Sequence, residues 1–331
     1  MILFKSIIQQ RHNDPDCILL GDTTRLTEVE VKSAATVIAM TGGMLLLSDD
    51  LSKLSSERLR VASRIFPVTG VTGITLDLHN TSESGIPSLI RLWCTDEVAA
   101  DFQSATAVEM ASNNAKRTSF SSDKSWDNRS IRNRNCLPVA KGLGTWSMLS
   151  LSNWLDKPAD VSVPFSASLP PKKVVETQDL HLGYHVFSFW MSKYAWVATN
   201  QSGKKIRKKL GPHESEIFHV KPVSLNHGQY IGSELHFTCG YEVISFHSTS
   251  TCIDLQLRND LKRSGFVYLY LPCYSNAMKV TMSGMAVRGE VVFRTPKIGH
   301  NNTFYGGQVI RVWVVVNGNK STDDGRVTVN I

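Results

Sequence analysis

The chain has 331 residues, of which 42% are hydrophobic and 20% charged, as is ordinary for a globular protein. No apolar run reaches the length that crosses a bilayer, so we expect no membrane partner. The formal net charge of +7 could favour a nucleic acid, but the densest basic run, 204–209, is accompanied by no nucleic-acid motif. We therefore expect no nucleic-acid partner.

The cysteines and the amino-terminal segment bear on metal binding, cofactors and cellular compartment. The six cysteines form no C-x-x-C pair and have no histidine at zinc spacing, so we expect free thiols, no metal site and no cofactor. Residues 1–8 lack the full apolar core and the cleavage site of a signal peptide. The compartment stays open between cytoplasm and secretion, and the sequence does not set the oligomeric state.

The chain begins with a short apolar segment and an acidic turn. Residues 2–8 predict a short buried strand, which leads into the turn at 13–17. A helix is predicted over 27–41, because Thr27 and Glu30 match a capping box and two glycines follow the last turn.

A second strand and a second helix follow. The continuous apolar run 44–47 predicts a buried parallel strand. Ser55 can cap a helix that ends before Pro67. The first 67 residues therefore contain two βα units, too few to close a barrel.

From Gly70 onward the pattern alternates as in β-sandwiches. Strands are expected at 74–78, 88–93, 146–154, 161–165, 185–190, 205–210, 216–220, 236–246, 253–257, 265–271, 278–282, 290–294, 309–316 and 326–331. Segment 105–135, rich in Ser, Asn, Lys and Arg, predicts a mobile loop.

We expect a protein that is mainly β, with an α/β region followed by a large antiparallel β-sandwich region. The domains are predicted at 1–70, at 71–223 with the mobile loop, and at 224–331, the last being a further all-β unit.

The acidic turn Asn13-Asp14-Pro15-Asp16-Cys17 and the later run 42–51 together resemble a known family. They are similar to the last two βα units of the α-galactosidase barrel in glycoside hydrolase families 27 and 36. In those families the seventh strand ends in Asn-Asp-Pro-Asp followed by Met or Cys, and Cys17 is the variant that resembles family 36. Segments 146–154 and 184–190 are similar to strands of that family's carboxyl-terminal β domain.

The resemblance covers residues 13 to about 271. It implies that residues 1–70 are the carboxyl-terminal part of a TIM-type (β/α)8 barrel, with the β-sandwich region after it.

The resemblance also gives roles to the acidic turn. It implies that Asp16 hydrogen-bonds a galactose hydroxyl, that Cys17 lines the pocket beside it, and that Asp14 braces the turn. A carboxylate suits a sugar because it accepts charge-assisted hydrogen bonds from hydroxyl groups. Without the family, five acids predict helix caps and turns: Asp14, Asp16, Asp22, Asp49 and Asp50.

The family hydrolyses terminal α-galactosyl residues with retention, through a nucleophile and an acid/base about 5 Å apart. It carries these two aspartates on the fourth and sixth strands, upstream of the acidic turn, and only twelve residues precede the turn here. We therefore assign no catalytic residue, expect this chain to be inactive by itself, and leave its status as an enzyme uncertain. Its partners would be α-galactoside sugars if the barrel is complete.

Two alternatives remain open. The β region could be a non-catalytic carbohydrate-binding or interaction module. The chain could also be a fragment of a galactosyltransferase of the raffinose-synthase type, which only acceptor-side loops upstream would distinguish from the hydrolase.

Overall fold

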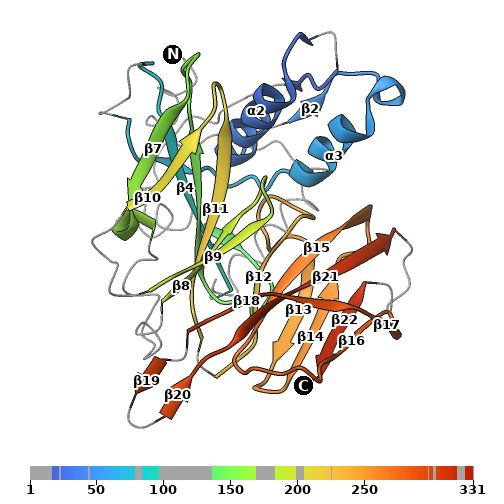
Figure 1. Cartoon of the computed structure of the whole chain (residues 1–331). Coiled ribbons are helices and arrows are strands. Elements are labelled where there is room, and N and C mark those ends of the chain that lie inside the picture. The colour runs from blue at the N-terminus through green and yellow to red at the C-terminus, as the bar shows by residue number, and fades with distance from the viewer. Residues whose placement is uncertain are drawn as a thin grey trace, which may run out of the picture.

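The structure is a computed structural model (Figure 1). It describes residues 17–21, 24–43, 45–78, 84–96, 136–168, 183–198, 205–224, 226–296, 298–300, 303–318 and 325–330. The predicted strand 2–8, the residues Asp14, Asp16 and Asp22, and the predicted loop 105–135 lie outside these ranges.

Both predicted helices are confirmed, with their predicted caps. Helix α2 spans Glu28–Thr41, with a complete capping box at Thr27 and Glu30 and with Gly42 as its left-handed C-cap. Helix α3 spans Ser56–Ile65 and is capped by Ser55. No helix in the described ranges is long and apolar enough to cross a membrane.

A small parallel sheet has one strand before α2 in the chain and one strand after it. Strand β1, Cys17–Ile18, pairs in parallel with β2, Leu46–Leu47. The chain thus makes one βαβ crossover before the short 3₁₀ helix η2, Leu51–Lys53, and then enters α3.

A seven-stranded sheet lies against α2, which in turn packs on α3 (Figure 1). Its strands are β3 Ile74–Thr75, β4 Leu89–Thr95, β5 Cys136–Pro138, β6 Trp146–Ser152, β8 Tyr184–Ser188, β9 Lys193–Val197 and β11 Ser215–Pro222. The order is β3-β4-β6-β11-β8-β9, and β5 pairs with β4. The β4–β5 pair is parallel and the others are antiparallel.

A hairpin-like pair stands beside this sheet. It joins β7, Ala159–Pro164, to β10, Lys205–Leu210, and the 3₁₀ helix η3, Phe165–Ser168, follows β7 directly. The basic run therefore lies on a strand whose side chains alternate between exposed and half-buried, ending in the buried Leu210.

The carboxyl-terminal part forms a four-stranded antiparallel sheet, a five-stranded antiparallel sheet and a short hairpin (Figure 1). The four-stranded sheet is β12 Gln229–Ser233, β15 Lys262–Leu271, β21 Gln308–Asn317 and β18 Gly289–Arg294. The five-stranded sheet is β13 Val243–Ser248, β14 Cys252–Leu257, β22 Arg326–Asn330, β16 Lys279–Met282 and β17 Met285–Val287. The hairpin is β19 Ile298–His300 with β20 Thr303–Tyr305.

One apolar core joins these parts. The cluster of buried hydrophobic residues runs from Ile18 through Val31 and Trp146 to Val329. A smaller cluster around Leu149 and Phe218 lies on the other face of the seven-stranded sheet, under β7 and β10. The predicted boundaries at 70 and 223 remain predictions, and the main core extends across both.

The description as mainly β is confirmed, whereas a TIM-type barrel remains a prediction. The predicted strand 236–246 is confirmed at 243–246 and wrong before that, because residues 234–242 form turns and bends and β13 begins at Val243. Phe237 is buried in this turn, and its backbone N–H donates to Arg64 O at 2.8 Å. An apolar residue in a turn thus mimicked a strand position.

Candidate functional site

The predicted sugar site at the acidic turn can be followed only at its last residue. Cys17 opens strand β1 opposite Leu46, is half-buried, and carries a free thiol. The roles of Asp14, Asp16 and Cys17 remain predictions. The sequence had placed the turn after a strand, whereas the described strand begins at the end of the motif, so Cys17 belongs to the sheet.

Two further acids near the ends of β1 and β2 have structural roles. The Asp49 carboxylate accepts a hydrogen bond from the Leu20 backbone N–H. A Cβ added at Gly21 would lie 2.7 Å from Asp49 Oδ1, so this approach requires glycine. Asp50 caps η2 through Ser52 and pairs with Lys53, and these hydrogen bonds lower the pKa of Asp50. The prediction of caps and turns is confirmed for these two residues.

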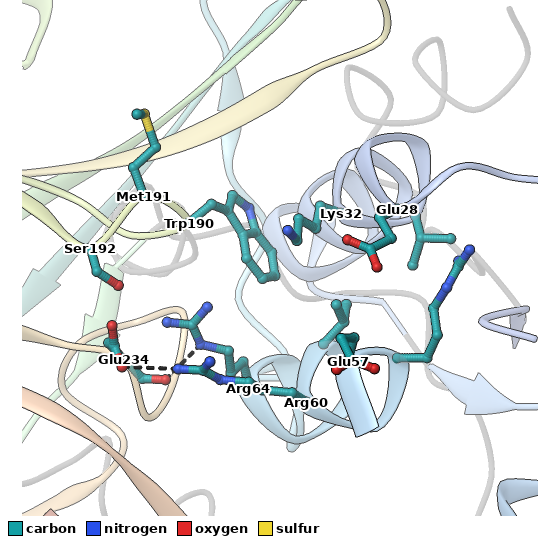
Figure 2. Close-up of a pocket in the computed structure, with 12 residues that line it drawn as sticks. Glu28, Lys32, Glu57, Arg60, Arg64, Trp190, Met191, Ser192 and Glu234 are labelled. Carbon is teal, nitrogen blue, oxygen red and sulfur yellow. Dashed lines mark hydrogen bonds and ion pairs between the residues drawn. The ribbon is translucent and has the colours of Figure 1, made fainter. Parts of the chain in front are cut away.

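A cavity of about 320 Å³ lies between the two helices and the turns at 190–192 and 234 (Figure 2). That volume is at the lower end of the range for small-molecule sites. It is lined by Glu28, Val31, Lys32, Glu57, Arg58, Arg60, Val61, Arg64, Trp190, Met191, Ser192 and Glu234. The lining combines one aromatic ring with charges of both signs.

The aromatic wall of this cavity is fixed from two sides. The indole Nε1–H of Trp190 donates to Thr36 Oγ1 on α2 at 2.8 Å. Its backbone N–H donates to Glu216 Oε1 at 2.8 Å, and Glu216 also accepts from the Ile217 N–H at 3.0 Å. Burial raises the pKa of Glu216. Trp190 is therefore held in place by α2 and β11.

The arginines of α3 connect the helix to the carboxyl-terminal sheets. Arg60 Nη2 lies 2.9 Å from Glu234 Oε2, and Arg64 Nε donates to Glu234 O at 2.6 Å. Arg64 also lies over the Phe189 ring, 4.6 Å from its centroid. Burial lowers the pKa of Arg64 to about 10. Arg58 and Arg64 each bury a terminal guanidinium nitrogen that has no hydrogen-bond partner among the described residues.

A second polar group lies inside the protein, and its side chains are buried. Lys221 is buried and donates to Leu143 O at 2.9 Å and to Tyr230 O at 2.7 Å, with its amino group 4.2 Å above the Trp146 ring. Burial lowers the pKa of Lys221 to about 8. Glu242 accepts hydrogen bonds from Tyr230 and Ser233, and burial raises the pKa of Glu242. This group is enclosed by the core, so it serves stability.

The described residues contain no cluster of three metal-ligating side chains. The sequence reasoning also missed the cavity, because its two sides are far apart in the chain. One signal was available: Arg60 and Arg64 are four residues apart on a helix, as are Glu28 and Lys32, so each pair shares one face.

No protein-family model matches the chain, and no curated protein does. Several solved structures are similar at low identity, and three of them illustrate the range. One is a putative α-N-acetylgalactosaminidase from Bacillus halodurans, at 11% identity and a TM-score of 0.35 over 61% of this chain and 32% of that one. Another is α-galactosidase I from Mortierella vinacea, at 12% identity and a TM-score of 0.33 over 64% of this chain and 41% of that one. The third is an isomalto-dextranase from Arthrobacter globiformis T6, at 14% identity and a TM-score of 0.33 over 92% of this chain and 47% of that one.

The chain thus spans between about a third and a half of the length of these structures.

Proposed function

We propose that this chain is the carboxyl-terminal part of a retaining α-galactosidase of the family 36 type. The proposal rests on one observation, the parallel pairing of Cys17–Ile18 with Leu46–Leu47 across a single helix, directly after Asn13-Asp14-Pro15-Asp16. A strand, a helix and a parallel strand are the repeating unit of a (β/α)8 barrel.

The exposure of this small sheet supports the same proposal. Parallel sheets are normally covered on both faces, and their strands are apolar for that reason. Here Leu46 is 50% exposed and Leu19, just after β1, is 44% exposed. Further βα units would cover both side chains.

The chemistry of the proposed enzyme needs two carboxylates that the family carries upstream of the acidic turn. In this chain Asp16 would orient the galactosyl group by accepting a hydrogen bond from a hydroxyl, and Cys17 would border that group. Neither residue supplies the nucleophile or the proton. The 331 residues would therefore bind one edge of the sugar and leave the reaction to upstream residues.

The first prediction concerns activity. The purified 331-residue chain should release no measurable galactose from an aryl α-galactoside. A longer in-frame product that adds two strand-end aspartates should hydrolyse it, and Asp16→Asn in that product should lower kcat/KM by about tenfold or more, because a charged hydrogen bond is lost. Rates of nitrophenol release measure both.

Asp50→Asn is the matched control. Asp50 caps η2, so this substitution should leave kcat/KM unchanged. Galactose release by the 331-residue chain, or an inert longer product, would contradict the proposal.

A second candidate function is a carbohydrate-binding β module, and an exposed aromatic pair favours it. Trp313 on β21 is 46% exposed and packs edge to face on Phe266, with 5.0 Å between the ring centroids. Arg311 lies over the same Phe266 ring at 4.4 Å. Trp313 lies on the exposed face of β21, where exposed residues alternate with buried ones. Exposed indole faces can stack on sugar rings.

The second prediction therefore concerns binding of a neutral sugar. If this module is functional, methyl α-galactoside should quench tryptophan fluorescence saturably, and Trp313→Ala should abolish the effect because the stacking face is removed. Met285→Ala, which changes a side chain that is 71% exposed, should not alter the titration. A flat titration of the unchanged chain would exclude this second function.

A further inference from the structure

The cavity between α2, α3 and the 190–192 turn is lined by the Arg64 guanidinium, which forms no ion pair with the described residues. The Arg64 side chain is among the buried charged groups, with the residue 7% exposed, and its Nη2 has no hydrogen-bond partner among the described residues. Its Nε bonds to a neutral carbonyl, that of Glu234. A buried guanidinium without a hydrogen-bonded counter-ion is costly.

The nearest acid in the cavity wall is already engaged. Glu234 Oε2 lies 2.9 Å from Arg60 Nη2 and accepts from the Phe266 backbone N–H at 3.3 Å. The stacking of Arg64 on Phe189 offsets part of the cost of burial but supplies no negative charge. An oxyanion entering the cavity would supply that charge to the part of the Arg64 side chain that lines it, since Nη2 itself is covered by the protein.

The geometry of the opening suits such a ligand. Figure 2 shows the Arg64 guanidinium projecting from α3 into the space below Trp190, with the Lys32 amino group directed toward the same ring from α2. The lining carries Lys32, Arg58, Arg60 and Arg64 against Glu28, Glu57 and Glu234, an excess of one positive charge. A charged end of a ligand would therefore lie between Arg64 and Lys32.

The rest of the lining indicates what the other end should be. Glu28 and Glu57 lie on the helix side of the space, opposite Glu234 and Ser192 (Figure 2). Their carboxylates can accept hydrogen bonds from hydroxyl groups, and Trp190 offers a flat apolar wall. A volume of about 320 Å³ admits a molecule the size of a monosaccharide.

We propose that this cavity binds a small hydroxylated oxyanion, of the class of hexuronates and sugar phosphates, with its anionic group between Arg64 and Lys32. The site is formed by α2, α3 and two turns of the β region, and its existence does not depend on the proposed galactosidase function. The shared chemistry is an anionic oxygen group on a polyol, and the experiment separates carboxylate from phosphate.

The test is calorimetric titration of the 331-residue chain with glucuronate, with glucose 6-phosphate and with glucose, at constant ionic strength. We expect saturable binding of at least one charged sugar and binding of glucose that is weaker by about tenfold or more, because a charge-assisted hydrogen bond is lost. The charged sugar that binds more tightly identifies the source of the oxyanion.

Three variants locate the binding. Arg64→Lys should weaken it by about tenfold, because a point charge replaces the planar donor fork, and Lys32→Gln should weaken it by several fold. Lys141→Gln, at an exposed lysine in another turn, should leave it unchanged. If Arg64→Lys fails to fold, Lys32→Gln decides.

The proposal is overturned if neither charged sugar binds saturably, or if Lys32→Gln binds as the unchanged chain does.

Discussion

Acidification from pH 7 to pH 5 should destabilise this protein, because three histidines are buried in uncharged form. They are His185, His219 and His236. Burial lowers the pKa of each from 6.5 to about 3. The folded protein therefore binds fewer protons than the unfolded chain over the interval between those values.

The difference in bound protons sets the direction in which stability changes with pH. Stability is fully present above pH 6.5 and is lost progressively as the pH falls toward 3, since only the unfolded chain takes up the protons. Each histidine contributes about 1.4 kcal/mol per pH unit, so three of them remove on the order of 6 kcal/mol between pH 6.5 and 5. A typical domain has only about 5–15 kcal/mol in total.

Buried acids oppose the histidines. Burial raises the pKa of Asp77, Glu216 and Glu242, so the stability linked to their extra proton is lost as the pH rises above their ordinary pKa values. The pKa of Lys221 falls from 10.5 to about 8, so the cost of burying its charge is complete below pH 8 and constant across the interval. The net slope of stability with pH is therefore smaller than the three histidines alone would give.

The hydrogen bonds of His185 show why the neutral form fits. Its Nε2 meets Gln229 Oε1 at 3.0 Å, so this nitrogen carries the proton, and Nδ1 accepts from the Tyr194 hydroxyl at 2.8 Å. Both nitrogens are satisfied without a second proton.

The measurement is urea unfolding at pH 7.5, 6.5, 5.5 and 5. His185→Gln should reduce the slope of the unfolding free energy by about 1.4 kcal/mol per pH unit, because one linked proton is removed. His247→Gln, at an exposed histidine, serves as control and should leave the slope as it was. An unfolding free energy that is constant between pH 7 and 5 would refute the argument.

The parts of the fold that the sequence predicted are those set by short-range interactions. The helix ends were predictable because Thr27 and Glu30 bond to each other's backbone and Ser55 accepts from the Arg58 N–H. The alternation in the second half of β21 was visible because only one face of that part of the strand is buried.

The failures share a long-range cause. Strand β12 was missed because Gly228 and Gly232 interrupt its apolar pattern, and both glycines are needed where side chains of Ile253 and Phe187 approach within 2.6 and 2.5 Å of an added Cβ. The cavity was missed because Arg64 and Glu234 are 170 residues apart. Sequence spacing contains no information about such a contact unless the tertiary arrangement is known.

Replacing Trp146 with alanine should cost about 3–5 kcal/mol of stability, the range for the largest buried side chains. Trp146 lies on β6 and is 2% exposed. Its indole Nε1–H donates to His219 Nδ1 at 3.2 Å, and the Lys221 amino group lies above its ring. The alanine variant would leave a cavity, an acceptor without its donor, and a buried cation without its aromatic partner.

Trp146→Phe separates these effects, because it keeps an aromatic ring beneath Lys221 and removes the indole donor. We expect it to cost about 1–3 kcal/mol, the range for an unsatisfied buried polar group. Trp313→Ala should cost less than about 1 kcal/mol, since surface substitutions rarely cost more. Denaturant midpoints at pH 7.5 give all three values on one scale. If Trp146→Ala lowered the free energy of unfolding no more than Trp313→Ala does, the role of Trp146 as the central side chain of the core would be contradicted. If the alanine variant does not fold, the comparison of Trp146→Phe with Trp313→Ala replaces it.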